Sequence, residues 1–106
     1  MSDIEKALAA IDGFQSELRL ADFARKYANA EIDLRREKAA YTEAYRDALR
    51  ALGVTDVKAG TSEHEKVIEA TKGEYAAREA ARRRLYKAKH KLISEFAKEQ
   101  SCPIRD

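Results

Sequence analysis

The sequence predicts an all-α protein: a long antiparallel helical hairpin, similar to a coiled coil, with a short N-terminal helix. Ala, Glu, Lys, Leu and Arg dominate, and 38% of the 106 residues are charged while only one is Pro, which is typical of long helices and coiled coils. Two long segments carry apolar residues at helical spacing. Between them, residues 53–60 have a glycine at each end and no helical pattern, which predicts the tip of the hairpin.

The short N-terminal helix is expected at about residues 3–12. Ser2 and Glu5 have the spacing of a capping box, and Ile4, Leu8 and Ile11 follow at helical intervals. Gly13 comes next, and Gly costs about 1 kcal/mol against Ala inside a helix. We therefore expect a kink or a short turn at Gly13.

The first long helix is expected at about residues 14–52, a segment without Gly or Pro. Its apolar residues recur at spacings of three, four and seven, so they lie within roughly 40° of one line on the helix surface. Such a stripe packs against a second helix. Gly53 then stands where a helix ends in the left-handed conformation. The stripe consists of Leu20, Phe23, Tyr27, Ala30, Leu34, Tyr41, Tyr45, Ala48 and Leu52.

The same helix has a second apolar face, on which Phe14, Leu18 and Ile32 lie roughly opposite the first stripe. A two-helix hairpin leaves this face in water. We expect it to be covered by the N-terminal helix folding back at Gly13, by a second copy of the chain that completes a bundle, or by another protein. Phe14, Leu18 and Ile32 are therefore the predicted protein interface.

The second long helix is expected at about residues 62–100, beginning with the capping-box spacing of Ser62 and Glu65. Residues 101–106 are expected to form a frayed tail. Folding the chain about residues 53–61 brings Tyr41 opposite Tyr75 and Phe23 opposite Leu92 or Ile93. This apolar match favours one antiparallel hairpin in a single domain of 106 residues.

A basic segment at residues 78–91 holds seven Lys or Arg against one Glu. One interpretation is a nucleic-acid surface, where lysines and arginines neutralise phosphates and Tyr86 stacks on an exposed base. The other, which we favour, is a solvated face, with Arg78 and Arg82 paired to acidic residues of the opposite helix (Glu31, Asp33 and Glu37). The residues expected to point outward are Arg83, Arg84, Lys87, His90 and Lys91.

No residue pattern indicates catalysis, a metal site, a cofactor or a small-molecule substrate. His64 and His90 lack the neighbours that a metal site needs, and Cys102 has no base nearby in sequence. Val54 and Val57, in the loop, are expected to cover the helix ends. We therefore expect a protein that is not an enzyme.

The expected location is the cytoplasm, because the sequence has no signal peptide, no run of about 18 apolar residues and a single cysteine. A membrane partner is not expected. The predicted function is that of a non-enzymatic helical protein-interaction module, an adaptor, assembly factor or inhibitor of a larger complex. Its expected partner is another protein or a second copy in a homodimer. The alternative is a small nucleic-acid-binding protein that uses the basic segment.

Overall fold

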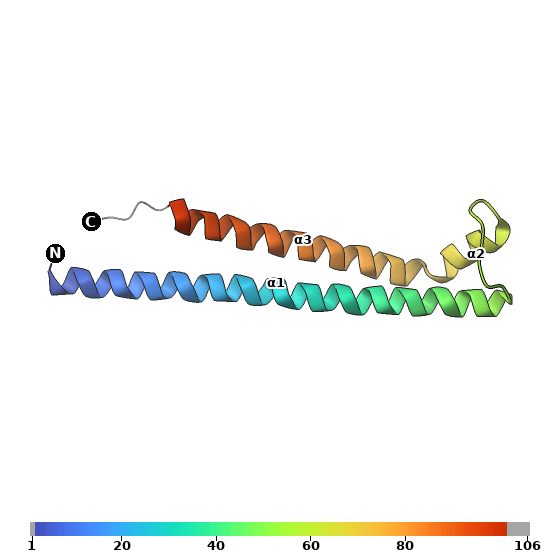
Figure 1. The fold of residues 1–106 in the computed structure, drawn as a ribbon, viewed down its shortest axis with the longest axis horizontal. Coiled ribbons are helices and arrows are strands. Elements are labelled where there is room, and N and C mark those ends of the chain that lie inside the picture. Colours follow the sequence, from blue (N-terminus) through green and yellow to red (C-terminus); the bar gives the residue numbers. More distant parts are fainter. Residues whose placement is uncertain (1, 102–106) are drawn as a thin grey trace. The chain divides into compact units, whose positions relative to one another are not determined.

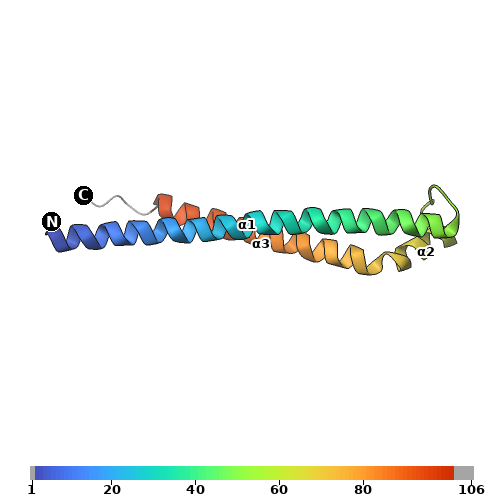
Figure 2. The same cartoon turned by 90° about the horizontal axis from the view of Figure 1, so that it is seen from below.

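The computed structural model describes residues 2–101 and is all-α, which confirms the predicted fold class (Figure 1). Its helices are α1 (Asp3–Leu52), α2 (Ser62–Ala70) and α3 (Lys72–Ser101). The chain reverses at residues 53–61, and α3 runs antiparallel to α1, which makes a helical hairpin (Figures 1 and 2). Except for Ser101, which ends α3, the predicted tail lies outside the described residues.

The N-terminal helix is not a separate element, because α1 continues through Gly13 for 50 residues. The predicted short helix at residues 3–12 and the predicted turn at Gly13 are therefore wrong. Ser2 does cap the helix, since its Oγ accepts a hydrogen bond from the Glu5 backbone N–H at 3.1 Å. One glycine costs about 1 kcal/mol in a helix. This cost is too small to end α1, because the most unfavourable step of helix formation is nucleation, which occurs once for the whole helix.

The end of α1 is a Schellman motif. Gly53 has a φ of 70°, and its N–H donates to the Arg50 carbonyl oxygen at 3.0 Å, while the Val54 N–H donates to that of Leu49 at 3.1 Å. Both bonds satisfy carbonyls that have no partner further along the helix. The prediction that Gly53 ends the helix in the left-handed conformation is confirmed.

The start of α2 is capped by Thr61, one residue before the predicted Ser62. The Thr61 hydroxyl oxygen accepts a hydrogen bond from the His64 backbone N–H at 3.2 Å. The same hydroxyl donates to the Lys58 carbonyl oxygen at 2.7 Å, which ties the cap to the loop. Ser62 is instead the first helical residue.

The second arm is two helices, because Thr71 separates α2 from α3; the single helix predicted at residues 62–100 is wrong on this point. The buried Thr71 hydroxyl donates to the Val67 carbonyl oxygen at 2.8 Å. A threonine that bonds back four residues bends a helix, and Gly73 lowers helix propensity two residues later. Helical bonding resumes at once, since the Tyr75 N–H donates to the Thr71 carbonyl oxygen at 2.9 Å.

The chain divides into two units. Unit 2 comprises residues 30–85 and contains the end of α1, the loop, α2 and the start of α3. Its core holds every described apolar residue that is buried: Ala30, Leu34, Val67 and Ala81. The Tyr41 and Tyr75 rings meet edge to face with centroids 5.9 Å apart, which confirms that predicted pair.

Unit 1 combines the first part of α1, up to residue 29, with α3 from residue 86 onward. The Lys91 Nζ lies 5.5 Å from the centroid of the Phe23 ring, one residue away from the predicted partner Leu92. None of the described apolar side chains of unit 1 is fully buried. The side chains that face the partner helix are half-buried: Leu20, Phe23, Tyr27, Ala88 and Leu92.

Within residues 2–101, no helix contains a segment long and apolar enough to cross a membrane.

The continuity of α1 predicts opposite effects of alanine at two glycines. No atom lies within 4 Å of a Cβ built on Gly13, so Gly13→Ala should raise the free energy of unfolding by about 0.5–1 kcal/mol. Gly53→Ala should lower it by about 1–2 kcal/mol, because alanine disfavours the left-handed conformation. Urea unfolding followed by circular dichroism measures both. A Gly13→Ala variant that is less stable than the parent would contradict the continuous helix.

Candidate functional site

A row of large apolar side chains lies along the start of α1 in unit 1. Its residues follow one another at steps of four, three, three and four, and each is more than half exposed. A helix turns about 100° per residue, so Leu18 lies on the side of α1 away from the half-buried Leu20. We call this surface the N-terminal stripe. It consists of Ile4, Leu8, Ile11, Phe14 and Leu18.

The predicted interface residues are exposed: Phe14 by 61%, Leu18 by 54% and Ile32 by 51%. Phe14 and Leu18 belong to unit 1 and Ile32 to unit 2. Since α1 is continuous at Gly13, the N-terminal helix does not fold back over them, so that candidate cover is excluded. That these residues form an interface stays a prediction.

Ile4, Leu8 and Ile11 are missing from the predicted interface, because the sequence predicts a turn at Gly13. Their spacing is the signal that places them on this surface, because it continues without interruption to Phe14 and Leu18 on the same helix face.

A second row of exposed side chains lies on the α3 part of unit 1. Tyr86, Ile93 and Phe96 are each more than half exposed. His90 lies between them in the row, and its ring packs on Tyr86 with centroids 4.2 Å apart. We call Tyr86, His90, Ile93 and Phe96 the C-terminal stripe.

The predicted basic surface is divided between the two units. Arg83 and Arg84 belong to unit 2 and are exposed. They have no ion pair among residues 2–101. The other three predicted residues, all exposed, belong to unit 1: Lys87, His90 and Lys91.

These three unit 1 residues differ in their contacts. Lys87 has no ion pair within the described part of the chain, whereas the Lys91 Nζ lies 3.2 Å from a Glu95 carboxylate oxygen. His90 packs on Tyr86, so one face of the tyrosine ring expected to stack on a base already has a neighbour. The structure therefore does not bring the five predicted residues together as one set of free cations.

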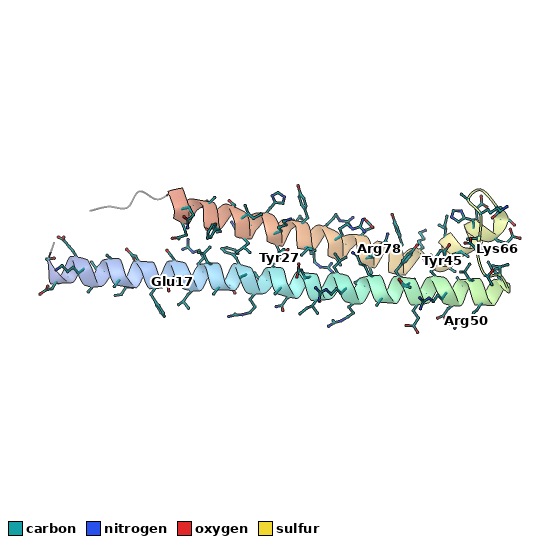
Figure 3. All side chains as sticks on the ribbon, viewed as in Figure 1. Glu17, Tyr27, Tyr45, Arg50, Lys66 and Arg78 are labelled. Carbon is teal, nitrogen blue, oxygen red and sulfur yellow. The ribbon has the colours of Figure 1, made fainter. Side chains whose placement is uncertain are left out.

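Arg78 and Arg82 do not pair with the acidic residues predicted for them. Both bind Glu79 on their own helix, at 3.3 Å and 3.2 Å respectively. The Arg78 guanidinium also lies over two tyrosine rings of unit 2, 4.6 Å from the Tyr41 centroid and 4.9 Å from that of Tyr75. Figure 3 shows Arg78 on the side of α3 that faces α1.

The pairing prediction was wrong because Glu79 is adjacent to Arg78 and one helical turn before Arg82, so both arginines reach it locally. The two tyrosine rings attract the guanidinium through their π faces. Arg78 Nε is buried and finds no hydrogen-bond partner in the described residues, which costs free energy.

A small cavity of about 250 Å³ lies in unit 2, lined by Tyr41, Ile68, Thr71, Lys72 and Tyr75. Ligand pockets usually measure about 300–1,000 Å³, so this cavity is below the usual range. Among residues 2–101 no three His, Cys, Asp or Glu side chains are grouped as metal ligands would be. Cys102 lies outside the described residues.

Glu95 is the buried acidic residue of unit 1, with 8% of its surface exposed. Its carboxylate lies 3.2 Å from Lys91 Nζ and 3.3 Å from Lys98 Nζ. The hydrogen bond from Lys91 lowers the pKa of Glu95, with Lys98 acting in the same direction against the effect of burial. The carboxylate therefore stays charged between two lysines one turn away on either side.

Comparison of the chain with protein-family models, with curated proteins and with solved structures gave no match.

The lowered pKa of Glu95 predicts a pH-dependent contribution to stability. A group whose pKa is lower in the folded state stabilises the fold above its unfolded pKa, and this effect is lost as the pH falls through the folded pKa. Glu95→Gln should therefore lower the melting temperature at neutral pH, and the difference from the parent should shrink in acid.

Thermal melts from about pH 7 to about pH 3 measure this difference. Glu99→Gln is the matched control, since Glu99 is exposed on the same helix and has no ion pair with any described residue. Its melting temperature should follow the parent at every pH. An equal effect of both substitutions would contradict the role of Glu95.

Proposed function

We propose that the chain is a non-enzymatic protein-interaction module that binds its partner through the N-terminal stripe of α1. The observation that carries this proposal is the exposure of five large apolar side chains on one continuous helix. Contiguous apolar surface of this kind marks sites where proteins associate. The module acts as an adaptor, an assembly factor or an inhibitor of a larger complex.

The mode of binding is that of an amphipathic helix laid against an apolar groove or a second helix. Such helices are recognised through anchors spaced three, four and seven residues apart, and Ile4, Leu8, Ile11 and Leu18 have that spacing. The flanking residues are mostly polar or small, so the apolar side chains carry the affinity.

The size of the stripe limits what it contributes alone. Burying one Leu, Ile or Phe completely contributes about 1.5–3 kcal/mol, so covering these partly exposed side chains contributes on the order of 5 kcal/mol. Association costs about 4–15 kcal/mol in lost freedom. A stable complex therefore needs further contacts beside the stripe.

The test is the double substitution Phe14→Asp with Leu18→Asp, which places two charges in the stripe. Pull-down from cells that make the chain, followed by mass spectrometry, should lose every specific partner, and any self-association should weaken at least about tenfold, since buried unpaired charge is costly. Circular dichroism should remain helical, because both positions are exposed.

The matched control is Phe14→Leu with Leu18→Met, which keeps the stripe apolar and should keep its partners. Partner capture and self-association that survive the two aspartates, in a variant of unchanged helicity, would refute the proposed role of the stripe.

Nucleic-acid binding is the second candidate, favoured by the exposed Arg83 and Arg84 of unit 2 and by Lys87 of unit 1, which have no ion pair among the described residues. Free cations of this kind neutralise phosphates. If they do so here, a mobility shift with duplex DNA should weaken with salt at a log–log slope of about −0.9 per phosphate.

The two units are tested separately, with Arg83→Glu and Arg84→Glu in one variant and Lys87→Glu in another. Binding to a phosphate surface should fall in each variant and the salt slope should become less steep. No shift at low salt, or a shift that both variants keep, would reject this candidate.

A further inference from the structure

We infer that the partner protein carries an acidic segment with one bulky apolar side chain, and that this segment binds to a groove on unit 2. The inference rests on the proposed function, since it names the chemistry of the partner and supplies the further contacts that the N-terminal stripe needs. It concerns only residues 30–85, which form unit 2.

The groove consists of two neighbouring hollows, which share Tyr41 as a wall. One is the cavity of about 250 Å³ described above, and the other is more open to solvent. Three of the five tyrosines in the sequence line the two hollows, and tyrosine is enriched where proteins bind one another. We call this surface the tyrosine groove. It consists of Tyr41, Thr42, Tyr45, Arg46, Ile68, Thr71, Lys72 and Tyr75.

The cavity has the size of one large apolar side chain. Ile68 and Tyr75 line it with about half of their surface exposed, so an apolar group that enters the cavity removes apolar surface from water. An apolar cavity of about 150 Å³ in another protein holds a benzene molecule. A cavity of about 250 Å³ is therefore large enough for the side chain of a phenylalanine or a leucine, although it is small for a drug-sized ligand.

The aromatic wall of the groove is held in place before any partner binds. The Arg78 guanidinium lies over the Tyr41 and Tyr75 rings, whose centroids are 5.9 Å apart. The centroid of the Tyr45 ring lies 6.2 Å from that of Tyr41. Because these rings already contact one another, binding a partner costs less side-chain entropy than ordering free side chains would.

The charged residues that line the groove are both cations, with Lys72 in one hollow and Arg46 in the other, and no carboxylate lines either hollow. Lys38 lies one helical turn before Tyr41 and is also exposed. None of these three cations has an ion pair among residues 2–101. Charge complementarity therefore favours a partner whose apolar side chain is flanked by Asp or Glu.

Single-stranded nucleic acid is the competing occupant, because bases stack on tyrosine rings and phosphates bind cations. Two observations favour the peptide. Arg78 already covers one face of the Tyr41 ring and one face of the Tyr75 ring. The cavity is also lined by Ile68 and Thr71, which form a pocket for a side chain rather than a flat surface for stacking.

The groove and the N-terminal stripe bind the same partner at two places. Each contact is weak alone, but once one has formed, the other becomes an intramolecular step. Linked contacts of this kind raise the affinity over that of either one by about 10²–10⁴-fold. A partner with both an apolar surface and an acidic segment is thus distinguished from proteins that have only one of them.

The test titrates three synthetic peptides into the isotope-labelled full chain, followed by two-dimensional NMR. The first peptide is Asp-Glu-Asp-Phe-Asp-Glu-Asp. It should shift the amide signals of Tyr41, Thr42, Thr71 and Tyr75. The second, with alanine in place of phenylalanine, should bind at least about tenfold more weakly because it has no large side chain to bury. The third, with Asn and Gln in place of Asp and Glu, should bind more weakly and lose the salt dependence of the first.

Substitutions in the groove test its residues. Ile68→Asp should weaken binding of the first peptide at least about tenfold, because it puts a charge in the apolar hollow, and Lys72→Glu should weaken it at least about fivefold. The matched control is Lys66→Glu, an equal change of charge at an exposed lysine of unit 2 that does not line the groove. At about 0.15 M salt it should stay within about twofold of the parent, because distant charges are screened. Circular dichroism checks that each variant remains helical.

The inference is overturned if the first peptide causes no shifts at millimolar concentration, if the alanine peptide binds equally well, or if Lys66→Glu and Lys72→Glu have the same effect. An oligothymidylate of equal charge that binds the groove more tightly than the first peptide would also overturn it. Phe14→Asp with Leu18→Asp should leave peptide binding unchanged, because both residues belong to unit 1. If the peptide does not bind while that double variant still loses its partners, the inference fails and the proposed function stands.

Discussion

A helix that packs against a single neighbouring helix buries only one of its sides. The other features of this chain follow from this restricted burial. In unit 2 the buried side holds a core of Ala30, Leu34, Val67 and Ala81, two of them alanines, whose small side chains let two helices approach closely. In unit 1 the inward-facing side chains are only half-buried, and two rows of large apolar side chains are exposed to water. The chain therefore has more apolar surface than its own helices cover.

The hairpin was predictable because its signals are local and repeated. Apolar residues at helical spacing over many turns indicate a helix, and a single unfavourable residue does not outweigh this pattern. The glycines of residues 53–60 interrupt the pattern where the chain reverses. The two errors have different origins. Gly13 is a single unfavourable residue in a long favourable segment, so it does not end α1. Thr71 is an ordinary residue in sequence, and it separates α2 from α3 through a hydroxyl bond that only the folded backbone provides.

The candidate site was predictable to the extent that exposure follows from helical geometry. Phe14 and Leu18 lie opposite the stripe that faces the partner helix, and they are exposed as this position implies. The local pairing of Arg78 and Arg82 with Glu79 was not predicted, because rings, hydrogen bonds and ion pairs compete for a long flexible side chain. The burial of Glu95 between two lysines was not predicted, because helical spacing identifies buried apolar residues but not polar residues that are buried in ion pairs.

The sparse core described above also determines how the folded chain responds to temperature. The heat capacity of a protein rises on unfolding mainly because apolar surface becomes hydrated, by about 12–15 cal/mol/K per residue in ordinary globular domains. A chain whose large apolar side chains are hydrated before it unfolds has less surface left to expose, so its heat-capacity change is smaller. Its stability then varies more gently with temperature, and cooling weakens it less than a domain with a large dry core.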